Sequence, residues 1–304
     1  MVAKLKQLRE STGDDSATAH FYCSSGGNAG LACVLAALTI GCQATIVVPK
    51  STTPFMIAKL RDLGATDVIQ QGDSWQEADN YLTGTLMTAA KERGEVPIYV
   101  APFDDPEIWN GNSGITKEIS KQIDEATQHY PTPGTTTGTP NVDAIVCSVG
   151  GGGLFAGIMQ GINELNLRDK TKVIAVETAG AESLHEALAK KEHITLPAIT
   201  SLATSLGARK VAKQAYEYGQ QENVVSTVLT DAEAIQGCKK FLNDERYLVE
   251  LACGVCPAVC YQGKLKELLP DLNENSTVVI IVCGGSNMSS DIMDEYFAKY
   301  INKN

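Results

Sequence analysis

Four consecutive glycines stand in the stretch "SVGGGGLFAG" at residues 148–157, between an apolar run and the start of an amphipathic segment. Glycines leave backbone N–H groups accessible, and the N-terminus of a helix carries a partial positive charge. A loop of this kind between a strand and a helix is typical of a site for an anionic group. The sequence therefore predicts a phosphate site here.

Two other interpretations of the same loop stay open at this point. Gly151, Gly153 and Ala156 match the G-x-G-x-x-A fingerprint of dinucleotide-binding proteins, and Glu177 ends the next apolar run, where an acid would bind a ribose. Alternatively, the glycines serve only the tight packing of a strand against a helix. Glycine placed in regular structure costs roughly 1 kcal/mol per residue, which disfavours a purely structural role.

A second loop, "SSGGNAG" at residues 24–30, also lies between a strand pattern and a helix pattern. Its two hydroxyls, its carboxamide and its accessible amides suit a small carboxylate, although Ser, Gly and Asn also favour ordinary turns and helix caps. A dinucleotide would have no use for this second loop. A third polar loop, "CGGSN" at residues 283–287, follows the last strand pattern.

Short β-branched runs alternate with amphipathic stretches along the whole chain, which predicts parallel sheets covered by helices on both faces. The first series contains strands near residues 19–25, 43–49, 66–71 and 97–103, with helices beginning near Asn28, Thr53 and Asp73. The second series contains strands near residues 142–150, 171–178, 224–230 and 276–285. The segment "PTPGTTTGTPN" at residues 131–141 is expected to be a surface loop.

The three polar loops all follow strands, and open α/β sheets bind ligands beyond the carboxyl ends of their strands. We therefore expect the loops to face one crevice. A phosphate clamp, a carboxylate clamp and a third polar contact together predict a phosphorylated cofactor that meets an amino or keto acid.

Composition and charge exclude several classes of protein. The chain has 304 residues, of which 43% are hydrophobic and 20% charged, and no run reaches the roughly 18 apolar residues that a membrane span needs. The formal net charge of −11 would repel nucleic acid. The start "MVAKLKQLRE" has no apolar signal-peptide core, so a cytoplasmic location is expected.

The nine cysteines are expected to be reduced and mostly buried, because their number is odd and they are spread through apolar patterns. Cys253, Cys256 and Cys260 in "CGVCPAVC" have a spacing that superficially suggests a metal site. No second pair of cysteines or histidines stands near them, and the segment has the pattern of a buried helix.

Five stretches in this order resemble the catabolic L-serine/L-threonine dehydratases: residues 21–65, "PFDDPEIWNG", "SVGGGGLFAGI", "AVETAGAESL" and "VCGGSN". The resemblance covers essentially the whole chain. It implies a pyridoxal-phosphate enzyme with the two-domain tryptophan-synthase β-like fold, which is fold type II of these enzymes. It also implies a homodimer that acts on a small amino acid.

The resemblance further implies roles for individual residues. Cys283 would face the pyridine nitrogen of the cofactor, and Asn28 would reach its phenolic oxygen. Glu177 and Ala181 match the region where the family binds a monovalent or divalent cation. The phosphate would lie on Gly150, Gly151, Gly152 and Gly153, and the substrate carboxylate on Ser25, Gly26, Gly27 and Asn28.

The implied reaction converts L-serine to pyruvate and ammonia, and L-threonine to 2-oxobutanoate and ammonia. In this family the lysine that bonds to the cofactor belongs to an S-x-K-x-R-G motif, and the sequence contains no such motif. Lys4 and Lys6 lack the flanking residues of the motif and are expected to be solvated surface charges.

The missing motif leads to the expectation that the chain lacks the first several dozen residues of the family and has no catalytic lysine of its own. The alternative to an active dehydratase is then a non-catalytic remnant. The expected organisation is a remnant of an N-terminal helix at residues 1–13, a small α/β domain at 14–105 and a large cofactor-binding domain at 106–304.

Overall fold

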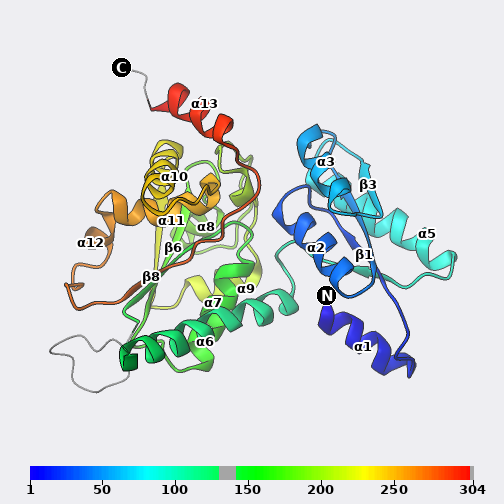
Figure 1. Cartoon of the computed structure of the whole chain (residues 1–304), viewed down its shortest axis with the longest axis horizontal. Helices are drawn as coiled ribbons and strands as arrows, with labels where there is room; N and C mark the ends of the chain where they lie inside the picture. The colour runs from blue at the N-terminus through cyan, green and yellow to red at the C-terminus, as the bar shows by residue number, and fades with distance from the viewer. Residues whose placement is uncertain (130–141, 302–304) are drawn as a thin grey trace. The chain divides into compact units, whose positions relative to one another are not determined.

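The structure is a computed structural model that describes residues 1–129 and 142–301, so the expected surface loop at 131–141 lies outside the described residues. The chain divides into two compact units, Met1–Pro102 and Phe103–Asn304. Figure 1 shows the first unit in blue to cyan and the second in green to red. Each unit contains its own sheet of four strands.

The first unit contains a parallel sheet with the strand order β3-β2-β1-β4. His20 at the start of β1 pairs with Gln43 of β2 and with Pro97 of β4, which sets the register. The strands are β1 (His20–Cys23), β2 (Gln43–Val48), β3 (Asp67–Gln70) and β4 (Pro97–Tyr99).

Helices cover both faces of this sheet because successive strand residues point to opposite faces. Phe21 of β1 and Ile46 of β2 lie in a core with α1, α2 and α3, whereas Tyr22 and Val47 lie in a separate core with α4, η1 and α5. The helices are α1 (Val2–Thr12), α2 (Asn28–Thr39), α3 (Pro54–Asp62), α4 (Trp75–Tyr81), the π-helical turn η1 (Leu82–Leu86) and α5 (Met87–Glu92).

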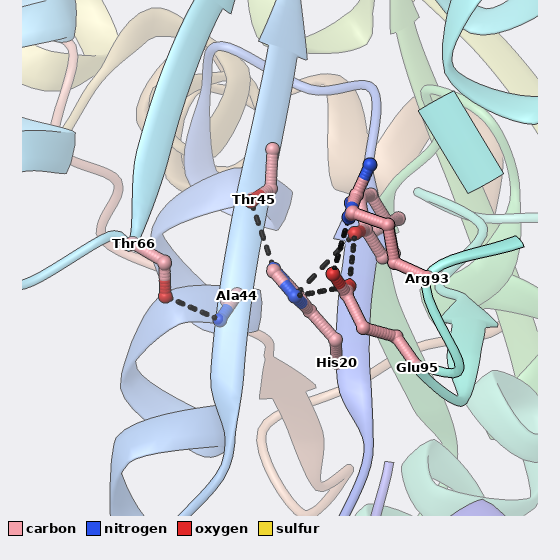
Figure 2. Close-up of polar contacts among 7 residues, drawn as sticks. His20, Ala44, Thr45, Thr66, Arg93 and Glu95 are labelled. Carbon is pink, nitrogen blue, oxygen red and sulfur yellow. Dashed lines mark hydrogen bonds and ion pairs between the residues drawn. The ribbon is translucent and has the colours of Figure 1, made fainter. Parts of the chain in front are cut away.

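A polar cluster ties the turn before β4 to strands β1 and β2 (Figure 2). The His20 ring contacts Thr45 Oγ1 through Nε2 at 2.8 Å and Glu95 Oε2 through Nδ1 at 3.2 Å, and Arg93 donates to Glu95 Oε1 at 2.8 Å. Burial lowers the pKa of His20, because the charged imidazolium would lose its water. The cluster thus joins the first residue of β1, Thr45 of β2 and the turn before β4.

The second unit repeats the topology of the first, with the parallel strand order β7-β6-β5-β8. The strands are β5 (Ala144–Ser148), β6 (Lys172–Thr178), β7 (Val224–Leu229) and β8 (Val278–Ile280). The helices are α6 (Pro106–His129), α7 (Gly153–Glu164), α8 (Ser183–Lys190), the 3-10 turn η2 (Thr204–Leu206), α9 (Lys213–Gly219), α10 (Asp231–Glu245), α11 (Leu251–Tyr261), α12 (Lys264–Leu268) and α13 (Ser290–Tyr300).

Helices α6 and α7 lie side by side (Figure 1), and two glycines of α7 allow this approach. A Cβ atom on Gly157 would lie 2.9 Å from the carbonyl oxygen of Trp109, and one on Gly161 would lie 2.8 Å from that of Ser113. Real Cβ atoms do not approach backbone so closely, so larger residues would push α6 away. The packing fixes α7, which begins directly after the four glycines.

The fold class expected from the sequence is confirmed, because parallel sheets with helices on both faces form both units. The segment around Cys253 is the buried helix α11, as predicted, and all nine cysteines are free, with seven of them buried. Within the described ranges, no His, Cys, Asp and Glu side chains are grouped to hold a metal ion. None of the helices in these ranges has the length and apolarity for crossing a membrane.

Candidate functional site

The strand order of the second unit brings two of the predicted loops together. The chain runs from β5 outward to β6 and β7 and returns to β8 on the other side of β5, so the order reverses between β5 and β8. Ligands of open α/β sheets bind at such reversal points, beyond the carboxyl ends of the strands. The loops Gly150–Gly153 and Cys283–Asn287 follow these two strands.

The glycine loop packs tightly against its surroundings. A Cβ atom on Gly150 would lie 2.9 Å from the carbonyl oxygen of Ser205, and one on Gly151 would collide with the Phe103 ring. The backbone amide of Ala212 donates to the carbonyl oxygen of Gly151 at 2.9 Å. The packing interpretation therefore accounts for the glycines at these two positions.

Besides a packing requirement, since an added Cβ atom would lie 2.5 Å from Ala215 Cβ, Gly152 has a conformational one. Its φ of 90° and ψ of 0° lie in the left-handed region, which favours glycine, and it is the N-cap residue of α7. Gly152 has no side chain to cap this helix, so no N-cap side chain accepts from the first amides of α7. Amides in this arrangement bind anions, and the loop fits a phosphate group.

The loop after β8 differs from the sequence expectation, because β8 ends at Ile280 and Cys283 lies beyond the strand. Cys283 is exposed, unlike seven of the nine cysteines, which are buried. The loop is held by α11: Gly284 N–H donates to Cys253 Sγ at 3.3 Å, and Asn287 N–H donates to the buried Glu250 carboxylate at 3.2 Å. A Cβ atom on Gly285 would collide with Glu250.

The Cys283 thiol is neutral at physiological pH. Although the residue exposes part of its surface, protein atoms surround the thiol, and this burial raises its pKa to about 11, with a smaller contribution from Cys253 and Glu250. A neutral thiol beside a ring nitrogen adds no charge to the ring. A hydrogen bond with the side chain of Ser148, the last residue of β5, lowers this pKa by a smaller amount. Cys283 therefore lies near the end of β5.

A short 3-10 turn connects the two loops of the second unit. Gly150 lies against Ser205 and Leu206 of η2, and Asn287 Nδ2 donates to Thr204 Oγ1 of the same turn at 3.2 Å. Residues 204–206 therefore contact both loops. The sequence analysis missed this turn because it has no chemical motif of its own.

The first unit places the loop at residues 24–30 at its own reversal point, between β1 and β4. Gly27 N–H donates to Ser25 Oγ at 3.3 Å, and Gly27 is the N-cap of α2 with no side-chain cap. Asn28 begins α2. The hydroxyl, the amides and the helix N-terminus thus form a small anion-binding arrangement, as a carboxylate site would need.

Two glycines shape this loop. A Cβ atom on Gly30 would collide with the carbonyl oxygen of Ser25, and one on Gly26 would lie 2.8 Å from Thr52 Cγ2. Gly30 therefore lets the first turn of α2 pack directly on the loop backbone. The motif contained Gly30, but only the structure gives its role.

A half-buried carboxylate anchors the start of the same loop, and no sequence pattern points to it. Asp79 Oδ1, on α4, accepts from Ser24 Oγ at 2.5 Å and from Tyr99 Oη at 2.7 Å. Ser24 follows β1 and Tyr99 ends β4, so this contact spans the reversal point of the sheet. Burial and Asp79 together raise the pKa of Tyr99 far above its ordinary value, so Tyr99 stays a hydroxyl donor.

Lys4 does not have the solvated position expected from the sequence. Its Nζ atom donates to the carbonyl oxygen of Tyr99 at 3.2 Å and is partly buried, because α1 packs on the sheet through the buried Leu5. Lys6, in contrast, is exposed beside Glu10, as expected. The expectation of a surface charge is thus wrong for Lys4 and confirmed for Lys6.

Glu177 lies at the end of β6 and is fully buried. Its carboxylate accepts from the backbone amides of Leu184 and His185 at 2.8 and 2.7 Å, at the start of α8. Burial raises its pKa to about 8 in spite of these bonds. A carboxylate that is engaged with α8 is poorly available to a ribose, which disfavours the dinucleotide interpretation.

Unpaired oxygens lie next to this carboxylate. Glu182 Oε2 and Ser183 Oγ are buried and have no hydrogen-bond partner among the described residues, and the Glu182 charge further raises the pKa of Glu177. Ala181, also predicted for a cation, is fully buried in the same turn. The carboxylates of Glu177 and Glu182 and the unpaired Ser183 hydroxyl form an oxygen-rich environment between the end of β6 and the start of α8.

Comparisons with known proteins assign the chain to a family. The family model described as "Pyridoxal-phosphate dependent enzyme" matches residues 1–284. The chain is 40% identical over 286 residues to an L-serine dehydratase of Saccharomyces cerevisiae (strain AWRI1631), covering 93% of this chain and 82% of the yeast protein. It is also 40% identical over 274 residues to the human L-serine dehydratase/L-threonine deaminase, covering 89% and 77% of the two chains.

Solved structures agree with this assignment. The fungal L-serine ammonia-lyase from Rhizomucor miehei is similar with a TM-score of 0.80 and 30% sequence identity, over 98% of this chain and 87% of that chain. A processed threonine deaminase from Solanum lycopersicum shares the fold with a TM-score of 0.72 at 23% identity, over 97% and 74% of the chains. By its sequence and its fold, the chain belongs to the pyridoxal-phosphate-dependent enzymes, among the L-serine dehydratases.

Proposed function

We propose that the protein eliminates water from L-serine and L-threonine with pyridoxal phosphate as cofactor, so that pyruvate or 2-oxobutanoate is released with ammonia. The observation that carries this proposal is the pairing, at one reversal point, of an uncapped glycine turn with the loop of Cys283. An anion site beside a neutral thiol suits a phosphorylated pyridine. The identity of 40% with L-serine dehydratases supports the substrate class.

The residues of the second unit would hold the cofactor. The amides of Gly150–Gly153 would bind its phosphate at the start of α7, and the neutral Cys283 thiol would face its ring nitrogen. When bound, pyridoxal phosphate withdraws electrons from the α-carbon of an amino acid, so that the α-proton and the β-hydroxyl can leave. A thiol with a pKa of about 11 does not protonate the ring nitrogen fully, which favours rapid loss of the hydroxyl.

The residues of the first unit would hold the substrate. Ser25, Gly26, Gly27 and Asn28 offer a hydroxyl, amides and a carboxamide for its carboxylate, and Asn28 would also contact the phenolic oxygen of the cofactor. No S-x-K-x-R-G motif is present in the 304 residues, so we assign none of them to the transfer of the α-proton. The competing proposal, cofactor binding without turnover, rests on this observation.

We also propose a cation site at Glu177 and Ala181. The raised pKa of Glu177 and the unpaired oxygens of Glu182 and Ser183 support it, since a cation would neutralise the buried Glu177 carboxylate and the half-buried Glu182 carboxylate. Thermal unfolding should show higher stability in potassium chloride than in tetramethylammonium chloride, and Glu177→Gln should abolish the difference. Equal stability of the unaltered protein in both salts would contradict the site.

The remaining expectations also stay proposals. One is the domain organisation, with a helical segment at 1–13, a small domain at 14–105 and a large domain at 106–304. The others are a homodimer and a cytoplasmic location. Sedimentation of the purified protein and microscopy of a tagged copy test the last two.

The decisive experiment measures keto-acid release from L-serine and L-threonine in the presence of pyridoxal phosphate. It compares the 304-residue chain with a fusion that carries a helix with the S-x-K-x-R-G motif upstream. We expect the fusion to release pyruvate from L-serine and 2-oxobutanoate from L-threonine at rates well above that of free cofactor. If neither protein releases pyruvate, the proposal fails.

Borohydride reduction and peptide mapping complete this experiment. In the fusion, the cofactor should be fixed to the lysine of the added motif. If one lysine of the 304-residue chain is labelled stoichiometrically, and its replacement stops pyruvate release, then this chain contains its own catalytic group and our assignment is wrong.

A further inference from the structure

Asp79 connects three elements at the reversal point of the first sheet. A single carboxylate oxygen, Oδ1, accepts the hydroxyl of Ser24 at 2.5 Å and that of Tyr99 at 2.7 Å. The three residues come from α4, from the end of β1 and from the end of β4. Hydrogen bonds to a charged acceptor are about twice as strong as those between neutral groups.

Ser24 transmits this contact to the loop that would bind the substrate. It is fully buried and precedes Ser25 directly, so its position sets where the backbone of Ser25 begins. On its other side, the carbonyl oxygen of Ser25 packs against Gly30, where no Cβ atom fits. The loop is thus held between a charged anchor and the first turn of α2.

We propose that Asp79 is a positioning residue for substrate binding, which holds the backbone of Ser25–Asn28 in the conformation that receives the substrate carboxylate. This inference rests on the proposed function of the loop. Asp79 acts through Ser24 and Tyr99, and its role is that of an acceptor placed between two hydroxyl donors. Sites of this kind lose affinity when a supporting contact shifts them by a fraction of an ångström.

The geometry specifies which replacements break the anchor. Alanine removes the acceptor and leaves the buried Ser24 hydroxyl without its partner, whereas asparagine keeps one carbonyl oxygen for both donors. Asp79→Asn should therefore behave nearly like the unaltered protein if the acceptor position matters. Asn80→Ala is the matched control, because Asn80 follows Asp79 on α4, is exposed and bonds only to Gln76 among the contacts described.

Two measurements test the inference, the first of which needs no activity. Hydrogen exchange of the amides of residues 25–30 should be about tenfold faster in Asp79→Ala than in the unaltered protein, and unchanged in Asn80→Ala. The second uses the form of the protein that releases pyruvate. The KM for L-serine should rise about tenfold in Asp79→Ala while kcat stays within about twofold, because ground-state and transition-state binding weaken equally.

Several results would overturn the inference. Equal hydrogen exchange in Asp79→Ala and the unaltered protein would show that Asp79 does not hold the loop, and a fall in kcat at constant KM would show a different role. Failure of Asp79→Asn to restore KM would show that the charge is needed rather than the acceptor. Should Asp79→Ala not fold, Ser24→Ala removes one of the two bonds and must raise KM in the same direction.

Absence of pyruvate from every form would refute the proposed function instead. The exchange measurement would still decide whether Asp79 anchors residues 25–30.

Discussion

Replacing Gly152 by alanine should destabilise the second unit by two separate effects. A side chain at φ 90° costs about 1 to 2 kcal/mol, because the left-handed region is unfavourable for L-residues with a Cβ atom. The new Cβ atom would also lie 2.5 Å from Ala215 Cβ and 2.8 Å from Val211 Cγ2, both of which are buried. Overpacking of this kind costs about 1 to 3 kcal/mol, so the total loss should be about 2 to 5 kcal/mol.

Gly263 provides a matched control within the same unit. Its φ is 75° and its ψ is 2°, and nothing lies within 4 Å of the position that a Cβ atom would take. Gly263→Ala should therefore lower the free energy of unfolding only by the conformational cost of about 1 to 2 kcal/mol. The difference between the two variants isolates the steric term at the glycine loop.

Urea unfolding followed by circular dichroism measures both losses, and equilibrium dialysis measures the affinity for pyridoxal phosphate. Gly152→Ala should lose more stability than Gly263→Ala and should also bind the cofactor more weakly, since the loop must shift. If both variants lose the same stability, the packing argument at Gly152 is refuted. If Gly152→Ala binds pyridoxal phosphate with unchanged affinity, the loop does not hold the phosphate.

Three further outcomes are expected. Gly30→Ala should destabilise the first unit and speed hydrogen exchange at Ser25, whereas Gly27→Ala, with open space at its Cβ position, should lose less stability in the same measurement. Burial raises the pKa of Glu177 from 4.5 to about 8, so between these pH values the folded protein retains a proton that the unfolded chain releases. The melting temperature without added metal cations should therefore fall as the pH rises from 4.5 to 8. The fall should be smaller in Glu177→Gln. Burial lowers the pKa of His20 below 6.5, so as the pH falls this histidine is protonated in the unfolded chain before it is protonated in the folded protein. Stability should therefore fall as the pH drops below 6.5. In the same thermal assay, His20→Gln should reduce that fall.

Most of the fold could be predicted from the sequence, because β-branched runs and amphipathic stretches alternate regularly. All eight predicted strands exist, and the helices expected near Asn28, Thr53 and Asp73 begin at Asn28, Pro54 and Trp75. The glycine turns were recognised because few other residues permit a strand to turn directly into a helix. The predicted end of the last strand is wrong. The apolar pattern continues through Val282, whereas β8 ends at Ile280.

The supporting residues of the site could not be predicted, because they depend on strand order. Asp79 and Ser24 are far apart in the sequence and meet only because β1 lies beside β4, with α4 packed on the same sheet. Lys4 was misjudged for a similar reason, since its acceptor is a backbone carbonyl of β4. Backbone acceptors have no sequence signature.

The turn Thr204–Leu206 has a consequence for how such a site can change during evolution. It touches the glycine loop through Ser205 and Leu206 and the loop of Cys283 through Thr204, so a substitution there should shift both of the loops that we propose for the cofactor. If a substitution of Cys283 changed the surroundings of the cofactor ring, the turn Thr204–Leu206 would have to fit the altered loop. Otherwise the glycine loop, which contacts the same turn, would shift away from the phosphate. Evolution of a different chemistry on this fold should therefore involve coordinated substitutions in three short segments, and substitutions in only one of them should be selected against. The segments are Gly150–Gly153, Thr204–Leu206 and Cys283–Asn287.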